Sequence, residues 1–413
     1  MTPSEPTPAD RGGRAAQALV VVGIVALAFN LRPAAVSIGP VLDEVSHSLG
    51  MGTAATSLLT SLPVLSFATM GAVAPRFARL LGLHRTTLVA LVLVALGLFA
   101  RAHVGHQLAF LVLSFVALAG MAVANVLLPS LVKLHFPTRV GLLTALYSTS
   151  LAIGLTTASV ATVPLGTRNG DLDWRRGLVV WGFTAAVAVL PWIALVRRDR
   201  RPQDSGSPIG TGDVARTRLG WVMAVFFGLQ SLQAYSIFGW VAKVYRDADF
   251  SAHDAGLLLG AITGISIPLS FVIPALTARV KDQRLLLTAV MACYPVGYLG
   301  LILAPHSGAW VWAFTLGIGT CTFPFILTLI GLRARTAAGT AALSAFTQSA
   351  GYLIAVVGPF GVGALHAATD GWTVPLAVLL ALCVPQYLVG LMACRPDLLE
   401  DQLDSAGARP QQQ

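Results

Sequence analysis

Residues 15–31 read AAQALVVVGIVALAFNL and contain no Asp, Glu, Lys, Arg or His. Extended past Arg32 to about Leu42, this run exceeds the roughly 20 residues that a helix needs to cross about 30 Å of hydrocarbon. Eleven further stretches lack the same residue types: 48–75, 86–100, 107–132, 140–167, 177–196, 219–242, 255–278, 285–305, 307–332, 336–365 and 371–394. The sequence therefore predicts an all-α integral membrane protein with twelve transmembrane helices.

Composition and charge distribution agree with this class. The chain is 55% hydrophobic and 11% charged, with a mean hydropathy of +0.75, whereas a soluble domain carries about 25% charged residues. A net charge of +9 would suggest nucleic-acid binding in a soluble protein. Here most of the 27 Lys and Arg residues fall in the tails and in alternate loops, and the other loops hold only Arg101, Arg168, Arg175, Arg176, Lys243 and Arg246. By the positive-inside rule, this asymmetry predicts cytoplasmic N and C termini and no nucleic-acid partner.

The longest polar connection, residues 197–218, divides the predicted spans into six and six. Residues of the two halves match at an offset near 199: Asn30 with Gln230, Gly39 with Gly239, Pro75 with Pro274, Arg85 with Arg284 and Gly141 with Gly339. Such a repeat predicts two pseudo-symmetric six-helix bundles related by an axis along the membrane normal, with a substrate site between them at mid-depth. We expect a disordered cytoplasmic tail (1–14), an N-terminal bundle (15–197), a cytoplasmic linker (198–216), a C-terminal bundle (217–395) and a cytoplasmic tail (396–413).

Arg32 lies near the middle of span 1, whereas all 18 Asp and Glu residues fall in tails, loops or span ends. A guanidinium buried without an anion costs several kcal/mol or more, so Arg32 is the candidate anchor for a transported ligand with anionic or strongly polar character. Pro33 disfavours helical geometry at Arg32 and frees a carbonyl one turn earlier. In the alternative interpretation Arg32 caps such carbonyls. Asp43 and Glu44 are about 16 Å away along the helix, beyond the reach of the side chain.

Polar side chains of other spans are further candidates for substrate contacts. An amide in hydrocarbon must face protein or water rather than lipid. From the spans that would line or flank a central cavity we expect contacts by Asn30, Asn125, Tyr147, Gln230, Gln233, Gln348 and Tyr352. The alternative for the amides is a hydrogen bond between helices of one bundle. The alternative for the hydroxyls of Thr320, Thr322 and Thr328 is a bond to a carbonyl of their own helix.

Residues at span ends are expected to anchor helices at the membrane surface. Arg85 and Arg101 flank the short stretch 86–100, and their side chains are long enough to extend from it to the polar surface. Trp240 and Lys243, at the outer end of span 7, fit the same interfacial role.

The sequence contains no constellation typical of an enzyme. All eight histidines lie in loops or at span ends, and there is no phosphate-binding glycine loop, no metal-ligand spacing and no Ser, His and carboxylate at one depth. The four cysteines lack paired spacing and are expected to be small buried hydrophobes. We therefore expect neither catalysis nor a metal or cofactor.

Four motifs can be compared with known families: Asn30-Leu31-Arg32-Pro33 with Gly39-Pro40 in span 1, Asn125-Val126-Leu127-Leu128-Pro129-Ser130-Leu131-Val132-Lys133 with Phe136-Pro137 after span 4, Leu229-Gln230-Ser231 in span 7, and Gln348-Ser349-Ala350-Gly351-Tyr352 before Gly371-Trp372-Thr373. With them the chain resembles the cyanate and 2-nitroimidazole permease family of the major facilitator superfamily over essentially all twelve spans. The resemblance implies the major facilitator fold and a secondary carrier of small anions or nitro-heterocycles. Lys243 departs from it, because a less polar residue is expected there.

We therefore expect a permease of a bacterial cytoplasmic membrane, a monomer that works by alternating access. A multidrug exporter of the same superfamily is the nearest alternative. It predicts a roomier, aromatic-lined cavity for lipophilic cations, which Arg32 would repel. A membrane receptor is the alternative of another class. It predicts a sizeable soluble signalling domain, whereas few residues follow Arg395.

Overall fold

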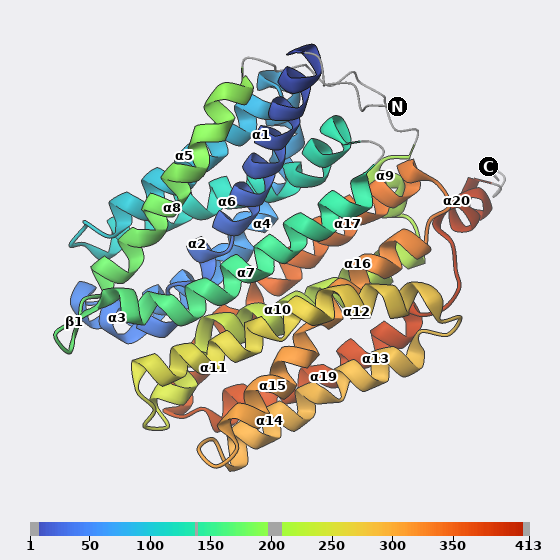
Figure 1. Ribbon diagram of the computed structural model, residues 1–413. Helices are drawn as coiled ribbons and strands as arrows, with labels where there is room; N and C mark the ends of the chain where they lie inside the picture. The colour runs from blue at the N-terminus through green and yellow to red at the C-terminus, as the bar shows by residue number, and fades with distance from the viewer. Residues whose placement is uncertain (1–7, 137–138, 197–208, 408–413) are drawn as a thin grey trace, which may run out of the picture.

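The computed structural model describes residues 8–136, 139–196 and 209–407 (Figure 1). Within these residues twelve helices, some of them interrupted, are long and apolar enough to cross a membrane. The all-α prediction with twelve spans is thus confirmed. The one sheet of the described residues is a two-stranded antiparallel hairpin in a loop, in which Thr167 pairs with Leu172 and Arg168 with Asp171.

The first six spans form one bundle. Its elements are α1 (Pro8–Asn30), α2 (Pro33–Val36), η1 (Gly39–Val41) and α3 (Leu42–Leu49), which together make span 1, followed by α4 (Thr53–Leu81), α5 (Leu83–Arg101), α6 (Gln107–His135), α7 (Val140–Gly166), β1 (Thr167–Arg168), β2 (Asp171–Leu172) and α8 (Trp174–Leu195).

The last six spans form the second bundle. After the short α9 (Thr211–Val214) come α10 (Arg218–Arg246), α11 (Ala252–Gly264), α12 (Ser266–Arg279), α13 (Arg284–Met291), α14 (Cys293–Leu303), α15 (Ala309–Thr320), α16 (Thr322–Leu332), α17 (Ala337–Ala355), α18 (Val357–Thr369) and α19 (Thr373–Ala393), and then α20 (Leu399–Gly407).

Proline explains why four spans of the second bundle are interrupted. The helices α11, α13, α15 and α17 each end at the residue four positions before a proline, namely Pro268, Pro295, Pro324 and Pro359. Proline has no N–H to donate to the carbonyl four residues back, and its ring clashes with that carbonyl. The kinks in spans 8, 9, 10 and 11 are therefore encoded locally.

The two bundles lie side by side, the first in blue to green and the second in yellow to red (Figure 1). Across the seam between them, α4 packs on α17 and α18, and α7 packs on α11 and α12. Close approach depends on glycine: a Cβ on Gly39 would lie 3.0 Å from the Phe238 carbonyl oxygen of the opposite bundle, and one on Gly260 would collide with Val160 Cγ2. We name the two ends of the molecule by their elements, the α3 end (lower left in Figure 1) and the α20 end (right).

Two predicted tails contain helices. α1 begins at Pro8, inside the segment expected to be disordered, with proline at a first helical position where its missing N–H costs nothing. α20 lies in the predicted C-terminal tail and is held by its contacts: Leu399 is fully buried, and Gln402 Oε1 accepts a hydrogen bond from Leu219 N at 3.0 Å. Residues 1–7, most of the linker (197–208) and 408–413 lie outside the described residues.

Candidate functional site

Span 1 is interrupted just before Pro33, as predicted, but Arg32 itself has helical dihedral angles (φ −92°, ψ −35°), so the expected departure from helical geometry at Arg32 is wrong. α1 ends at Asn30, and the Arg32 carbonyl accepts hydrogen bonds from Ala35 N and Val36 N at 3.0 and 3.2 Å to start α2. A neighbouring helix of the same bundle supports the interrupted segment, because Gly154 of α7 lies against the Phe29 carbonyl with no room for a Cβ. The break places the Arg32 side chain between the bundles instead of on a continuous helix surface.

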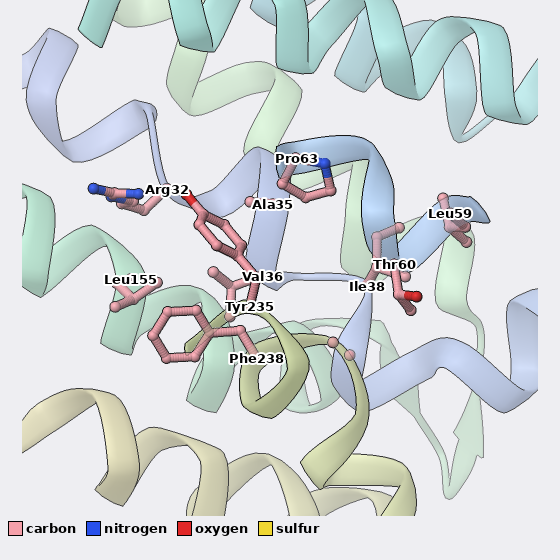
Figure 2. Close-up of a pocket in the computed structure, with 12 residues that line it drawn as sticks. Arg32, Ala35, Val36, Ile38, Leu59, Thr60, Pro63, Leu155, Tyr235 and Phe238 are labelled. Atoms are coloured by element: carbon pink, nitrogen blue, oxygen red, sulfur yellow. The ribbon is translucent and has the colours of Figure 1, made fainter. Parts of the chain in front are cut away.

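Arg32 lines a cavity between the two bundles (Figure 2). The empty volume is about 430 Å³, counted with the open solvent at its mouth. Its walls come from α2, the turn before η1, η1, α4, α7 and α10: Arg32, Ala35, Val36, Ile38, Gly39, Leu59, Thr60, Pro63, Leu155, Tyr235, Phe238 and Gly239. The Tyr235 hydroxyl points toward Arg32 and interacts with its charge.

No Asp or Glu of the described residues forms an ion pair with Arg32. The side chain is half-buried. The nearest carboxylates in its own span, Asp43 and Glu44, form ion pairs with other cations. The cavity therefore presents a guanidinium and a phenolic hydroxyl without a resident anion, which suits a ligand that accepts hydrogen bonds or carries negative charge.

Aromatic rings surround Tyr235 beside the cavity. Tyr352 of α17 is stacked on Phe67 of α4 with 4.8 Å between ring centroids, which joins the two bundles, and Tyr235 lies 6.5 Å from Phe67 and 6.4 Å from Tyr352. Phe238 packs edge-on against Tyr235 at 6.1 Å. These distances are typical of aromatic pairs. The cluster gives the site an apolar, planar wall beside the charged group.

The structure brings some predicted site residues toward this region. Asn30 lies two residues before Arg32 and is buried, with Nδ2 donating to the Ala26 carbonyl at 2.8 Å and Oδ1 without a partner among the described residues. Tyr352 belongs to the aromatic cluster. Asn125 and Tyr147 are half-buried and do not line the cavity, and Gln348 donates to Ser344 Oγ at 2.9 Å in its own helix.

Gln230 and Gln233 do not line this cavity, and their contact with substrate stays a prediction. Both are fully buried inside the second bundle. Gln230 Nε2 donates to the Thr320 carbonyl at 3.0 Å, and Gln233 Nε2 donates to the Leu379 carbonyl at 2.8 Å. Tyr298 donates to Gln233 Oε1 at 2.6 Å. Each amide thus joins span 7 to its neighbours.

The hydroxyls of span 10 behave as their alternative interpretation predicts. Thr320, Thr322 and Thr328 donate to the carbonyls of Gly317, Gly319 and Pro324 at 2.7 to 2.9 Å.

Three residues expected at the membrane surface point inward instead. Arg101 is fully buried, since its side chain turns toward the interrupted part of span 1. Trp240 is 3% exposed, and its Nε1 donates to the Pro359 carbonyl at 2.8 Å. Lys243 Nζ donates to Asp43 Oδ1 at 2.8 Å. Interfacial anchoring was therefore the wrong prediction for these three, because each finds a polar partner within the protein.

Ion pairs join the two bundles at the α3 end. Lys243 and Arg246 of α10 face Asp43 and Glu44 of α3, with Arg246 Nη1 at 2.8 Å from Glu44 Oε1. Lys243 also pairs with Asp247 at 3.1 Å, whose other oxygen accepts from Trp372 Nε1 at 2.9 Å. The polar character of Lys243 is explained by this network.

The sequence analysis did not single out Tyr235 and Phe238 as residues of the site. Tyr235 and Phe238 are three residues apart on α10 and share a face, whereas Tyr235 is rotated by about 140° from Gln230 at 3.6 residues per turn. One face of α10, with Gln230 and Gln233, thus lies inside the second bundle, and the other, with Tyr235 and Phe238, lines the cavity. The sequence signal that could have indicated this lining is the spacing of Tyr235, Phe238 and Gly239, which places them on one side of a helix.

A family model described as Major Facilitator Superfamily matches residues 18–385. The chain belongs to the major facilitator superfamily. It is 36% identical to the uncharacterized transporter YycB of Bacillus subtilis (strain 168), over 91% of this chain and 93% of that protein. It is 34% identical to the 2-nitroimidazole transporter of Escherichia coli (strain K12), over 91% and 95%, and 27% identical to the cyanate transport protein CynX of the same organism, over 89% and 94%. The predicted family resemblance is confirmed.

Solved structures show the same fold. A bacterial homologue of the human lysosomal transporter Spinster, in an inward-facing and unoccupied conformation, superposes with a TM-score of 0.74 at 13% identity, covering 94% of this chain and 98% of that one. The family model and the relatives named as transporters make the protein a transporter of this superfamily, not an enzyme.

Proposed function

We propose that this transporter carries a small anionic or nitro-bearing polar heterocyclic solute, such as cyanate or a 2-nitroimidazole, by alternating access, with Arg32 as the substrate anchor. The observation that carries the proposal is the position of Arg32. Arg32 lines a cavity between the bundles, with the Tyr235 hydroxyl beside it, and no carboxylate of the described residues forms an ion pair with it.

The donor set matches this substrate class. A guanidinium presents N–H groups in a planar fork that fits the two oxygens of a nitro group or carboxylate, and it attracts any small anion. The rings of Tyr235 and Phe238, which line the cavity, offer apolar surface to a heterocycle. The relatives named for 2-nitroimidazole and cyanate support the same class. A lipophilic cation, the substrate of the exporter alternative, would be repelled by Arg32.

The proposed setting is the inner membrane of a bacterium with both termini in the cytoplasm. The α20 end would then face the cytoplasm, and the α3 end, where ion pairs join the bundles, the outside. One chain contains both bundles and the whole cavity wall, so a monomer suffices for transport.

Uptake into proteoliposomes tests the proposal. Radiolabelled cyanate and 2-nitroimidazole are compared for wild type, Arg32→Ala and Arg32→Lys, with Arg168→Ala in the loop hairpin as the matched control. Loss of a charged hydrogen-bond partner should weaken binding by roughly 2 to 5 kcal/mol, and Lys should fail because it lacks the planar fork. Wild-type uptake by Arg32→Ala at normal abundance would refute the role of Arg32.

A further inference from the structure

Arg101 is a second arginine of the first bundle whose position needs an explanation. It is the last residue of α5, it is fully buried, and no Asp or Glu of the described residues pairs with it. Removing a charge from water without a counter-ion costs several kcal/mol, so this residue is a poor device for stability alone.

The partners of Arg101 all belong to the interrupted part of span 1. Nη1 donates to the Ala34 carbonyl at 3.2 Å, and Nη2 donates to Ser37 Oγ at 3.1 Å. Nε has no partner among the described residues. These two acceptors lie two and five positions after Arg32 in the chain.

The segment that receives these bonds needs outside support. α2 has four residues, and an isolated helix of this length is unstable because nucleation is costly. Since α2 ends at Val36, the Ala34 carbonyl gets no donor from a following turn of the same helix. Arg101 supplies that donor from a different helix.

The end of α5 that carries Arg101 is tightly packed and can therefore hold this segment in place. A Cβ on Gly97 would lie 2.8 Å from Ala117 N of α6, and a Cβ on Gly182 of α8 would lie 3.0 Å from Phe99 N. The backbone just before Arg101 is thus in close contact with two neighbouring helices. Movement of the guanidinium relative to the first bundle is correspondingly small.

We propose that Arg101 is a positioning residue of the transport site: through the Ala34 carbonyl and the Ser37 hydroxyl it fixes the interrupted segment of span 1 that presents Arg32 to the cavity. The inference rests on the proposed role of Arg32 in binding. The argument is geometric: two N–H groups of one planar guanidinium donate to two acceptors of the same short segment, and this fixes its position. A lysine keeps the charge but cannot hold both points in this geometry.

The test combines hydrogen exchange with transport. Amide exchange of residues 34–41 is followed by mass spectrometry in wild type, Arg101→Met and Arg101→Lys. The same proteins are assayed for KM and maximal uptake rate with 2-nitroimidazole and cyanate as probes. In both variants exchange of 34–41 should accelerate about tenfold or more and KM should rise about tenfold, the loss expected for one or two charge-assisted hydrogen bonds. Maximal rates should change much less.

Arg333→Met is the matched control. Arg333 is also buried and donates to the Ala393 and Cys394 carbonyls and to Gln283 Oε1 at 2.9 to 3.2 Å, but it lies in the second bundle at the α20 end. Its loss should lower thermal stability and leave both the exchange of 34–41 and KM unchanged. If Arg101→Met does not fold, Ser37→Ala removes one of the two points and should give an intermediate effect.

The outcomes separate this inference from the proposed function. Unchanged exchange of 34–41 in a folded Arg101→Met protein overturns the positioning role. Full restoration of KM by Arg101→Lys also overturns it, since charge alone would then suffice. If the wild type transports neither probe, the proposed substrate class fails, while the exchange experiment still decides whether Arg101 holds the segment.

Discussion

Lys243 of α10 donates to Asp43 of α3 at 2.8 Å, and this ion pair joins the two bundles at the α3 end. Arg246 and Glu44 form a second such pair. The four side chains are 21% to 25% exposed, so each pair is only partly screened by solvent. Opening the cavity toward this end requires that both pairs separate, which makes them a determinant of the balance between conformations.

Exchanging the charges of this pair should test the closure. Lys243→Asp alone should favour opening at the α3 end about fivefold, since a partly exposed pair contributes roughly 1 kcal/mol. The double variant Asp43→Lys with Lys243→Asp should restore only part of the closure, because the new charges at 243 and 43 would lie beside Asp247 and Arg246. Maleimide labelling of Thr60→Cys, which lines the cavity, measures access. The control is Arg176→Ala, whose partner Asp173 lies in the same bundle. Equal labelling of all variants would contradict a closing role.

Gly260 should be needed for contact between the bundles. An added methyl group would collide with Val160 Cγ2 of α7, so Gly260→Ala should hold the seam open and slow transport. Val160→Ala in the same chain should recover most of the rate because it removes the colliding atom. Gly331→Ala, where a Cβ meets nothing within 4 Å, is the control and should have wild-type transport. A Gly260→Ala rate equal to wild type would show that the seam adjusts freely.

Gln233 should matter for stability and not for substrate affinity. Gln233→Leu leaves the buried Tyr298 hydroxyl without its acceptor and removes one donor from the Leu379 carbonyl, which should cost about 1 to 3 kcal/mol. Thermal unfolding in detergent measures the loss, and KM should stay at the wild-type value. In this background Tyr298→Phe should cost less than in wild type, because the shared bond is already gone. A raised KM without a loss of thermal stability would contradict this prediction and indicate that Gln233 contacts the substrate.

Glu400 should make stability depend on pH at the α20 end. Desolvation opposes its ionisation, but hydrogen bonds from Arg335 N, Thr336 N and Thr336 Oγ1 outweigh it and lower the pKa of the Glu400 carboxyl to about 2. A lowered pKa contributes stability above the unfolded-state value of about 4.3, and this contribution disappears as pH falls toward the folded-state value.

Glu400→Gln should therefore lower the melting temperature at pH 7, and its difference from wild type should shrink between about pH 4.3 and pH 2. Asp404→Asn is the control, because this exposed carboxylate lies on the same helix. A constant difference across that pH range would exclude a role for the charge of Glu400.

The orientation of the chain is tested by fusion after Gln413. Because basic residues concentrate in the tails and alternate loops, we expect a fluorescent protein fused there to fold in the cytoplasm and alkaline phosphatase to be inactive. Phosphatase activity, which requires export, would place the C terminus outside.

The sequence by itself determined the number of spans, their division into halves, the break at Pro33 and the isolation of Arg32 from carboxylates. These features depend on hydrophobicity, on the missing N–H of proline and on the positions of charges along the chain. Each of these features is set by residues close together in the chain, so it can be predicted without knowing which helices pack against one another. The prolines of the second bundle interrupt their spans for the same reason.

The tertiary structure alone decided which polar groups meet. The amide face of α10 with Gln230 and Gln233 turned into the bundle, and the face of Tyr235 turned to the cavity. The sequence shows that these faces differ but not which neighbour each one contacts. The same holds for Arg101 and Lys243, which form hydrogen bonds inside the protein with Ser37 and Asp43, 64 and 200 residues away in the chain. Where a long side chain can reach either the membrane surface or such a partner, the packing of distant helices decides, because a buried donor is stabilised only by an acceptor that the fold brings to it.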